Sequence, residues 1–179
     1  IRAYAIPFVT IEPEVGLESI CRVFETINST GTRLTTFDLA VARFYPQPDL
    51  RALMEAAKDR NPVLGEFEIE GDRILQIIAI VRADQERRLP EPSRSELLRL
   101  PADLIEKEWD AAVEAMVGAL KWAQDNGARP GTLPNFGIVV SLAAFMRMFP
   151  GEDRRVDIDW GTPLRRWYFS RLLRPGARA

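Results

Sequence analysis

The segment Asn28-Ser29-Thr30-Gly31 is the stretch whose residue types most suggest a contact with a ligand. It follows a helix-periodic segment and precedes a second helix start, so its polar side chains would lie beside unpaired backbone N–H groups and near a helix N-terminus, an arrangement that binds anions. Asn and Gly are also ordinary helix-stop residues. Two interpretations therefore stay open: a tight corner between two helices, and a polar loop that touches a ligand.

Acidic residues offer only weak candidates for chemistry. Asp157 and Asp159 are a pair that could hold a divalent cation, but such a site needs more than two ligands. Glu66, Glu68 and Glu70 would share one face of an extended strand, where mutual repulsion favours exposure to solvent. The chain has no histidine, which excludes a Ser-His-Asp triad, a Cys-His pair and an HNH-type nuclease centre within these residues. No catalytic residue and no metal ligand is assigned.

The C-terminal segment 154–179 is basic, with seven arginines against two aspartates. Aromatic residues, among them Trp167 and Tyr168, alternate with these arginines, a composition that suits contact with a phosphate backbone. The candidate DNA contacts are Arg165, Arg166, Arg171 and Arg174. In the other interpretation the apolar residues pack inward and the arginines are solvated.

Composition is that of a folded domain without a bias toward nucleic acid or membrane. The chain has 179 residues, 46% of them hydrophobic, and a net charge of −2. Its single cysteine, Cys21, excludes an internal disulfide framework and fits a cytoplasmic location. The longest apolar run, 136–149, is too short to span a bilayer, so no membrane association is expected.

Hydrophobic periodicity predicts a mostly α-helical chain. Residues 5–11 are the exception: they read as a strand whose natural partners would lie upstream of Ile1, since one strand needs a sheet. Short pieces at 66–70 and 155–159 are also strand-like. Thr35 is the expected N-cap of a helix that ends near Tyr45, and Asp72 is a candidate cap for a later one. Further helices are expected at about 50–57, 95–100, 136–149 and 163–172. The longest should start near Pro101, carry an apolar stripe from Ile105 to Ala123 and end at Asn126-Gly127.

The pattern Phe24-x-x-x-Asn28-x-x-Gly31-x-x-Leu34, with a strand before it and a capped helix after it, resembles the N-terminal domain of GmrSD-type restriction endonucleases. That family joins a ParB/sulfiredoxin-like nucleotide core to a helical region. The segment Leu164 to Tyr168 resembles the aromatic helix near the end of the family's domain. The family's Asp-Gly-Gln-Gln-Arg motif, which is thought to serve nucleotide hydrolysis, is absent from these residues, as is its histidine-containing nuclease domain.

The resemblance implies that the chain is the helical half of a nucleotide-dependent DNA-defence protein. It would close or couple an upstream ParB-like core of the same chain and contact DNA. A nucleoside triphosphate and a divalent metal would act in that core, with no cofactor in residues 1–179. Residues 1–46 would end the core region and 47–179 would form a helical subdomain. Asn28, Ser29, Thr30, Gly31 and Leu34 would form the corner on the nucleotide side. The alternative is a helical protein-interaction domain with no nucleotide or DNA role.

Overall fold

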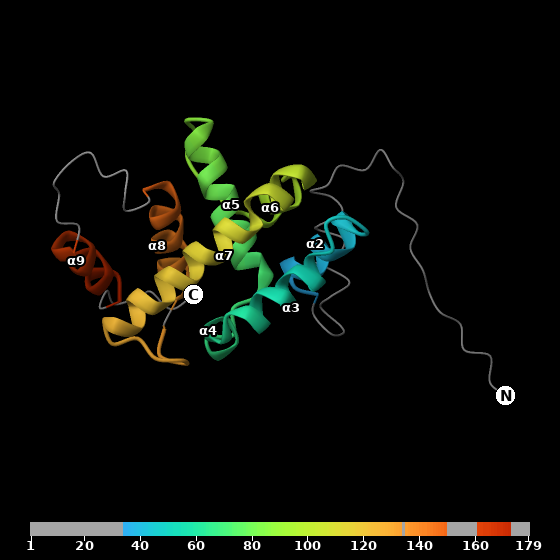
Figure 1. Ribbon diagram of the computed structural model, residues 1–179. Coiled ribbons are helices and arrows are strands. Elements are labelled where there is room, and N and C mark those ends of the chain that lie inside the picture. Colours follow the sequence, from blue (N-terminus) through green and yellow to red (C-terminus); the bar gives the residue numbers. More distant parts are fainter. Residues whose placement is uncertain (1–33, 134, 150–160, 173–179) are drawn as a thin grey trace, which may run out of the picture. The chain divides into compact units, whose positions relative to one another are not determined.

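The regular structure of the described chain is helical. A computed structural model of the protein describes residues 34–133, 135–149 and 161–172. These residues form eight helices and no strand (Figure 1), namely α2 (Thr36–Phe44), α3 (Leu50–Arg60), α4 (Pro62–Glu66), α5 (Gly71–Gln85), α6 (Arg94–Leu98), α7 (Ala102–Asp125), α8 (Phe136–Met148) and α9 (Gly161–Leu172). The prediction of a mostly α-helical chain is confirmed. The predicted strands at 5–11 and 155–159 lie outside the described residues.

Backbone contacts divide the chain into two compact units, Ile1–Thr35 and Thr36–Ala179. All eight helices belong to the second unit. The boundary expected between residues 46 and 47 falls between α2 and α3, and α2 packs against α3, α5 and α6. The assignment of 1–46 to a nucleotide-core region stays a prediction.

Helices α5, α7 and α8 pack against one another and form the centre of this unit (Figure 1). The sequence predicts one apolar stripe on α5, at Ile74, Ile77, Ile78 and Val81, but the helix is buried on more than one side. Leu75, Ala79 and Ala83 are buried in addition to the expected stripe. The reason is that α7 and α8 cover part of α5 while α2, α3 and α6 also pack against it.

The longest helix, α7, follows its periodicity closely. Its apolar stripe is predicted at spacings of three and four, and every member is buried, namely Ile105, Trp109, Ala112, Val113, Met116, Leu120 and Ala123. Gly127 has φ +92°, and the N–H of Ala128 donates to the carbonyl oxygen of Ala123 at 2.9 Å. The helix therefore ends in the Schellman manner that Asn126-Gly127 predicts.

The strand expected at 66–70 is wrong. Helix α4 begins at Pro62 and ends at Glu66, and the chain then turns back on itself. The N–H of Ile69 donates to the carbonyl oxygen of Leu64 at 2.8 Å, and Glu68 has φ +52°. This is a Schellman ending with a non-glycine residue in the left-handed position. Phe67 and Ile69 are buried on alternate positions because of the turn, and that alternation imitates a strand in the sequence.

The expectation that Asp72 caps a helix is also wrong. Helix α5 begins at Gly71 and its N-cap residue is Glu70, which makes no side-chain cap hydrogen bond. Asp72 instead lies inside the first turn, where burial raises the pKa of its carboxyl. Gly71 is required there by packing, because a Cβ atom at this position would overlap the ring of Phe37.

Candidate functional site

Most of the predicted corner lies outside the described residues. Asn28, Ser29, Thr30 and Gly31 are not among them, and Leu34 is described and exposed. Helix α2 begins at Thr36, directly after the expected N-cap residue Thr35. The helix after the corner thus begins where the sequence predicts, while the cap at Thr35 and the role of the corner stay predictions.

Helix α9 packs against the ends of α7 and α8 through its aromatic residues. Tyr168 is fully buried in a small cluster with Ala123, Ala128 and Ile138, and half-buried apolar residues pack around it. The ring of Trp122 meets the Tyr168 ring edge-on, with 5.3 Å between centroids. Two of the aromatic residues that alternate with arginines therefore pack inward: Tyr168 is unavailable for stacking with bases, and Trp167 is half-buried.

The arginines of α9 are exposed. Arg165, Arg166 and Arg171 make no ion pair with any described residue, and α9 contains no acidic residue. The fourth candidate, Arg174, lies outside the described residues. The exposed side chains are available to bind an anionic partner, and whether that partner is DNA stays a prediction.

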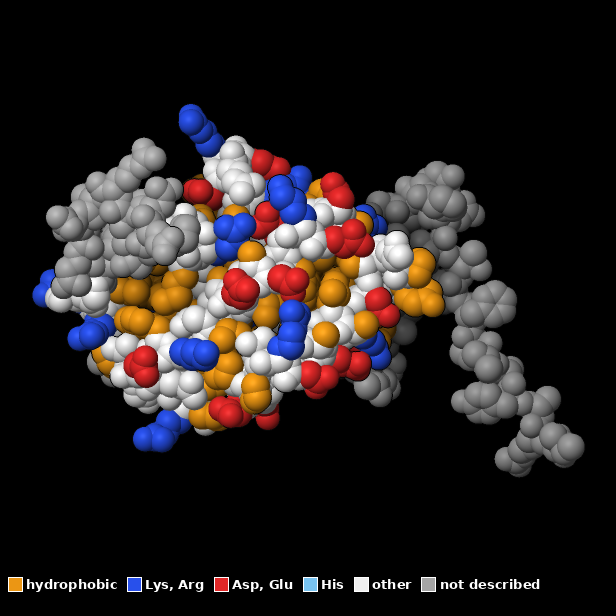
Figure 2. Space-filling model, viewed as in Figure 1, with side chains coloured by type: hydrophobic (Ala, Val, Ile, Leu, Met, Phe, Trp, Pro, Cys, Tyr) orange, Lys and Arg blue, Asp and Glu red, His pale blue; other side chains and the backbone are white. Residues whose placement is uncertain are grey.

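An apolar groove lies between α8 and α9, with a volume of about 370 Å³. Helix α8 contributes Ser141, Leu142 and Phe145, and α9 contributes Pro163, Leu164 and Trp167. Figure 2 shows hydrophobic side chains gathered at the left of the visible face, where α8 and α9 lie in Figure 1. Sequence reasoning did not find this groove, because its two walls are separated by the segment between the helices.

Phe149, the C-cap residue of α8, adds to this apolar surface. Its ring lies 5.1 Å from that of Phe145, centroid to centroid, and the residue is 52% exposed. Through Phe145, Phe149 is continuous with the apolar lining of the groove, and a contiguous exposed apolar surface is typical of an interaction site.

The acidic residues singled out in the sequence do not converge on a site. Glu66, Glu68 and Glu70 are exposed, as expected, and Glu70 pairs with Lys58 at 3.4 Å. Asp157 and Asp159 lie outside the described residues. Across the described ranges no three His, Cys, Asp or Glu side chains come together in a way that could hold a metal ion. No helix in those ranges is long and apolar enough to cross a membrane.

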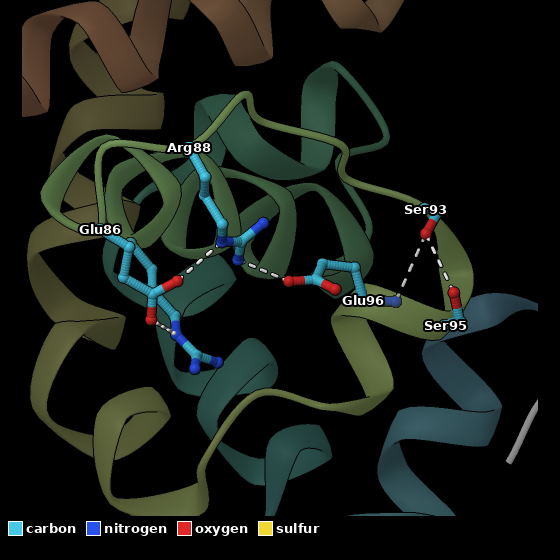
Figure 3. Close-up of polar contacts among 6 residues, drawn as sticks. Glu86, Arg88, Ser93, Ser95 and Glu96 are labelled. Carbon is cyan, nitrogen blue, oxygen red and sulfur yellow. Dashed lines mark hydrogen bonds and ion pairs between the residues drawn. The ribbon is translucent and has the colours of Figure 1, made fainter. Parts of the chain in front are cut away.

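A polar cluster that the sequence did not reveal joins the end of α5 to α6 (Figure 3). Arg88 donates from Nε to Glu86 at 2.7 Å and from Nη2 to Glu96 at 2.5 Å, and Arg82 also donates to Glu86 at 2.7 Å. The hydrogen bonds that Glu86 accepts, the one from Arg88 first and the one from Arg82 second, lower the pKa of its carboxyl. Every charge in the cluster has a partner, so we interpret it as a brace between two helices.

Comparison with protein-family models, with curated proteins and with solved structures finds no match to this chain.

Proposed function

We propose that this chain is the helical part of a GmrSD-like, modification-dependent DNA-defence protein of the cytoplasm. Its role would be to close an upstream ParB-like nucleotide core and to couple that core to DNA. The observation that carries the proposal is the corner pattern from Phe24 to Leu34, which runs directly into a helix beginning at Thr36. The nucleoside triphosphate and the divalent metal would act in the upstream core, and the helical part would hold no catalytic centre of its own.

The test is Asn28→Ala in the protein that carries the upstream core. If Asn28 touches nucleotide, the substitution should lower nucleotide binding or hydrolysis while the melting temperature stays nearly unchanged. If Asn28 only ends a helix, the melting temperature should fall and nucleotide affinity should persist in the folded fraction. If neither nucleotide binding or hydrolysis nor the melting temperature changes, both roles of Asn28 are excluded and the resemblance loses its most specific residue.

Asn126→Ala is the matched control. Asn126 is the C-cap residue of α7, and its side-chain amide donates to the carbonyl oxygen of Trp122 at 2.8 Å. Its loss should lower the melting temperature by a few degrees, since one hydrogen bond contributes about 1 kcal/mol. Nucleotide hydrolysis should remain, because we assign Asn126 no contact with the core.

DNA contact is tested separately on α9. The double variant Arg165→Ala/Arg166→Ala should weaken DNA binding and reduce its salt dependence by about one released counterion for each phosphate that the chain no longer neutralises. Arg51→Ala/Arg60→Ala removes the same charge from α3, where both arginines are exposed, and should leave DNA binding within about twofold. If the two double variants weaken DNA binding equally, the effect comes from the net charge of the chain and not from a site on α9.

A second candidate function, a protein-interaction domain, is favoured by one observation. The groove between α8 and α9 is apolar and borders on an exposed aromatic residue, Phe149. Neither nucleotide nor a phosphate backbone would fill such a groove, whereas apolar side chains of a protein partner would.

A further inference from the structure

The walls of the α8–α9 groove repeat the same spacing on both helices. Ser141, Leu142 and Phe145 stand at positions i, i+1 and i+4 of one helix, and Pro163, Leu164 and Trp167 stand at the same positions of the other. Side chains at these spacings share one face of a helix. The groove is therefore a channel between two rows of side chains, a shape that accepts the apolar face of a third helix.

The charge beside the groove is positive. Arg171 follows Trp167 by four residues and Leu164 by seven, so it lies on the groove side of α9, about one turn beyond Trp167. Arg165 comes two residues before Trp167 and is rotated by about 200° from it, so it lies on the side of α9 away from the groove. Of the exposed arginines described on α9, Arg171 is therefore the one best placed to meet a molecule that occupies the groove.

We propose that the groove between α8 and α9 binds an acidic amphipathic helix of a protein partner. This inference rests on the second candidate function and names the partner's chemistry. Apolar side chains at i, i+3, i+4 and i+7 of the partner would fill the groove against Phe145 and Trp167. Carboxylates flanking that stripe would pair with Arg171, for which the described chain offers no acidic partner.

The probe is a fluorescent helical peptide of about 16 residues, with leucines at i, i+3, i+4 and i+7 and glutamates on the flanks. A second peptide carries lysines in place of the glutamates. Binding is measured by fluorescence anisotropy with the whole chain. The acidic peptide should bind at least about tenfold more tightly than the basic one, since charge complementarity decides between partners of equal shape.

Three variants of the chain locate the binding. Arg171→Glu should weaken the acidic peptide about 5- to 10-fold and strengthen the basic peptide, and this gain would show that the variant is folded. Arg165→Glu makes the same charge change on another face of α9 and should alter neither affinity by more than about twofold. Ser141→Phe places a large side chain in the groove from an exposed position and should weaken both peptides at least about tenfold.

Several results would overturn the inference. Equal affinity for the two peptides would show that no acidic partner is selected, and equal effects of Arg171→Glu and Arg165→Glu would reduce the effect to net charge. Binding that survives Ser141→Phe would place the peptide elsewhere. Displacement of the acidic peptide by a DNA duplex from wild-type chain, but not from Arg171→Glu, would make nucleic acid the ligand of this face. None of these results bears on Asn28 or on nucleotide hydrolysis, so the nucleotide role of the proposed function is tested separately, whereas displacement by DNA would support its DNA contact.

Discussion

Tyr168→Phe should stabilise the protein. Tyr168 is fully buried, and its hydroxyl has no hydrogen-bond partner in the structure. Leaving a buried hydroxyl unpaired costs about 1–3 kcal/mol. Phenylalanine keeps the edge-on contacts with Trp122 and Phe169, at 5.3 and 5.5 Å between centroids. We therefore expect the free energy of unfolding to rise by about 1–2 kcal/mol, which corresponds to an increase in melting temperature of about 2–8 °C for a chain of this size.

The pH dependence of this gain identifies its cause. Burial raises the pKa of the Tyr168 hydroxyl above its ordinary value of 10.0. The folded chain therefore keeps this proton at pH values where the unfolded chain has lost it. The stability of the wild-type chain is therefore unaffected by this ionisation below about pH 10 and falls as the pH rises from there through the raised pKa. The advantage of Tyr168→Phe over wild type should accordingly widen above about pH 10.

Urea denaturation at about pH 7 and at several values between about pH 9 and 11 measures both effects. Tyr45 is 72% exposed, so Tyr45→Phe is the matched control and should leave stability unchanged within about 0.5 kcal/mol. A decrease of about 1 kcal/mol or more in Tyr168→Phe at neutral pH would show that the hydroxyl is hydrogen-bonded in solution and would refute the reasoning. An advantage that stays constant across the alkaline range would refute the pKa argument alone.

Two further predictions concern packing and the polar brace. Gly71→Ala should lower the free energy of unfolding by about 1–3 kcal/mol in thermal denaturation, because the added Cβ atom would overlap the ring of Phe37. Gly65→Ala is the control: its added Cβ atom would have no neighbour within 4 Å, so the substitution should be neutral or stabilising. For the brace, the lowered pKa of Glu86 means that its contribution is present above the ordinary value of 4.5 and is lost as the pH falls through the lowered pKa. The stability difference between wild type and Arg88→Gln should therefore shrink between about pH 6 and pH 3, and a constant difference would contradict this account.

Periodicity predicted the helices well where one face of a helix packs and the other meets solvent. Helix α7 is the clearest instance, since every residue of its predicted stripe is buried. Periodicity gives the wrong element where the chain turns without the glycine that usually marks a turn. Glu68 and Arg87 adopt positive φ angles of 52° and 54° at the ends of α4 and α5, positions that usually take glycine. Glutamate and arginine do not favour a positive φ, so the sequence does not predict the turn after α4, and the alternation of residues there resembles a strand.

The candidate site was only partly predictable for a different reason. Exposure of Arg165, Arg166 and Arg171 follows from charge alone. The groove beside them depends on two helices brought together by tertiary packing, and neither helix carries a local pattern that indicates a shared hollow. Leu164 and Trp167 read as ordinary packing residues until Phe145 is placed opposite them.

The arrangement of α7 and α8 has a consequence for the order in which the chain folds. These two helices share the most extensive packing of any helix pair described, and few residues separate them in the sequence. Closing so short a loop costs little entropy, so a hairpin of α7 and α8 is the element that we expect to form earliest. Substitutions between them should slow refolding; an example is Met146→Ala, because the sulfur of Met146 on α8 lies 3.7 Å from where a Cβ atom on Gly118 of α7 would stand. Tyr168→Phe should act mainly on the unfolding rate because α9 docks onto a hairpin already made.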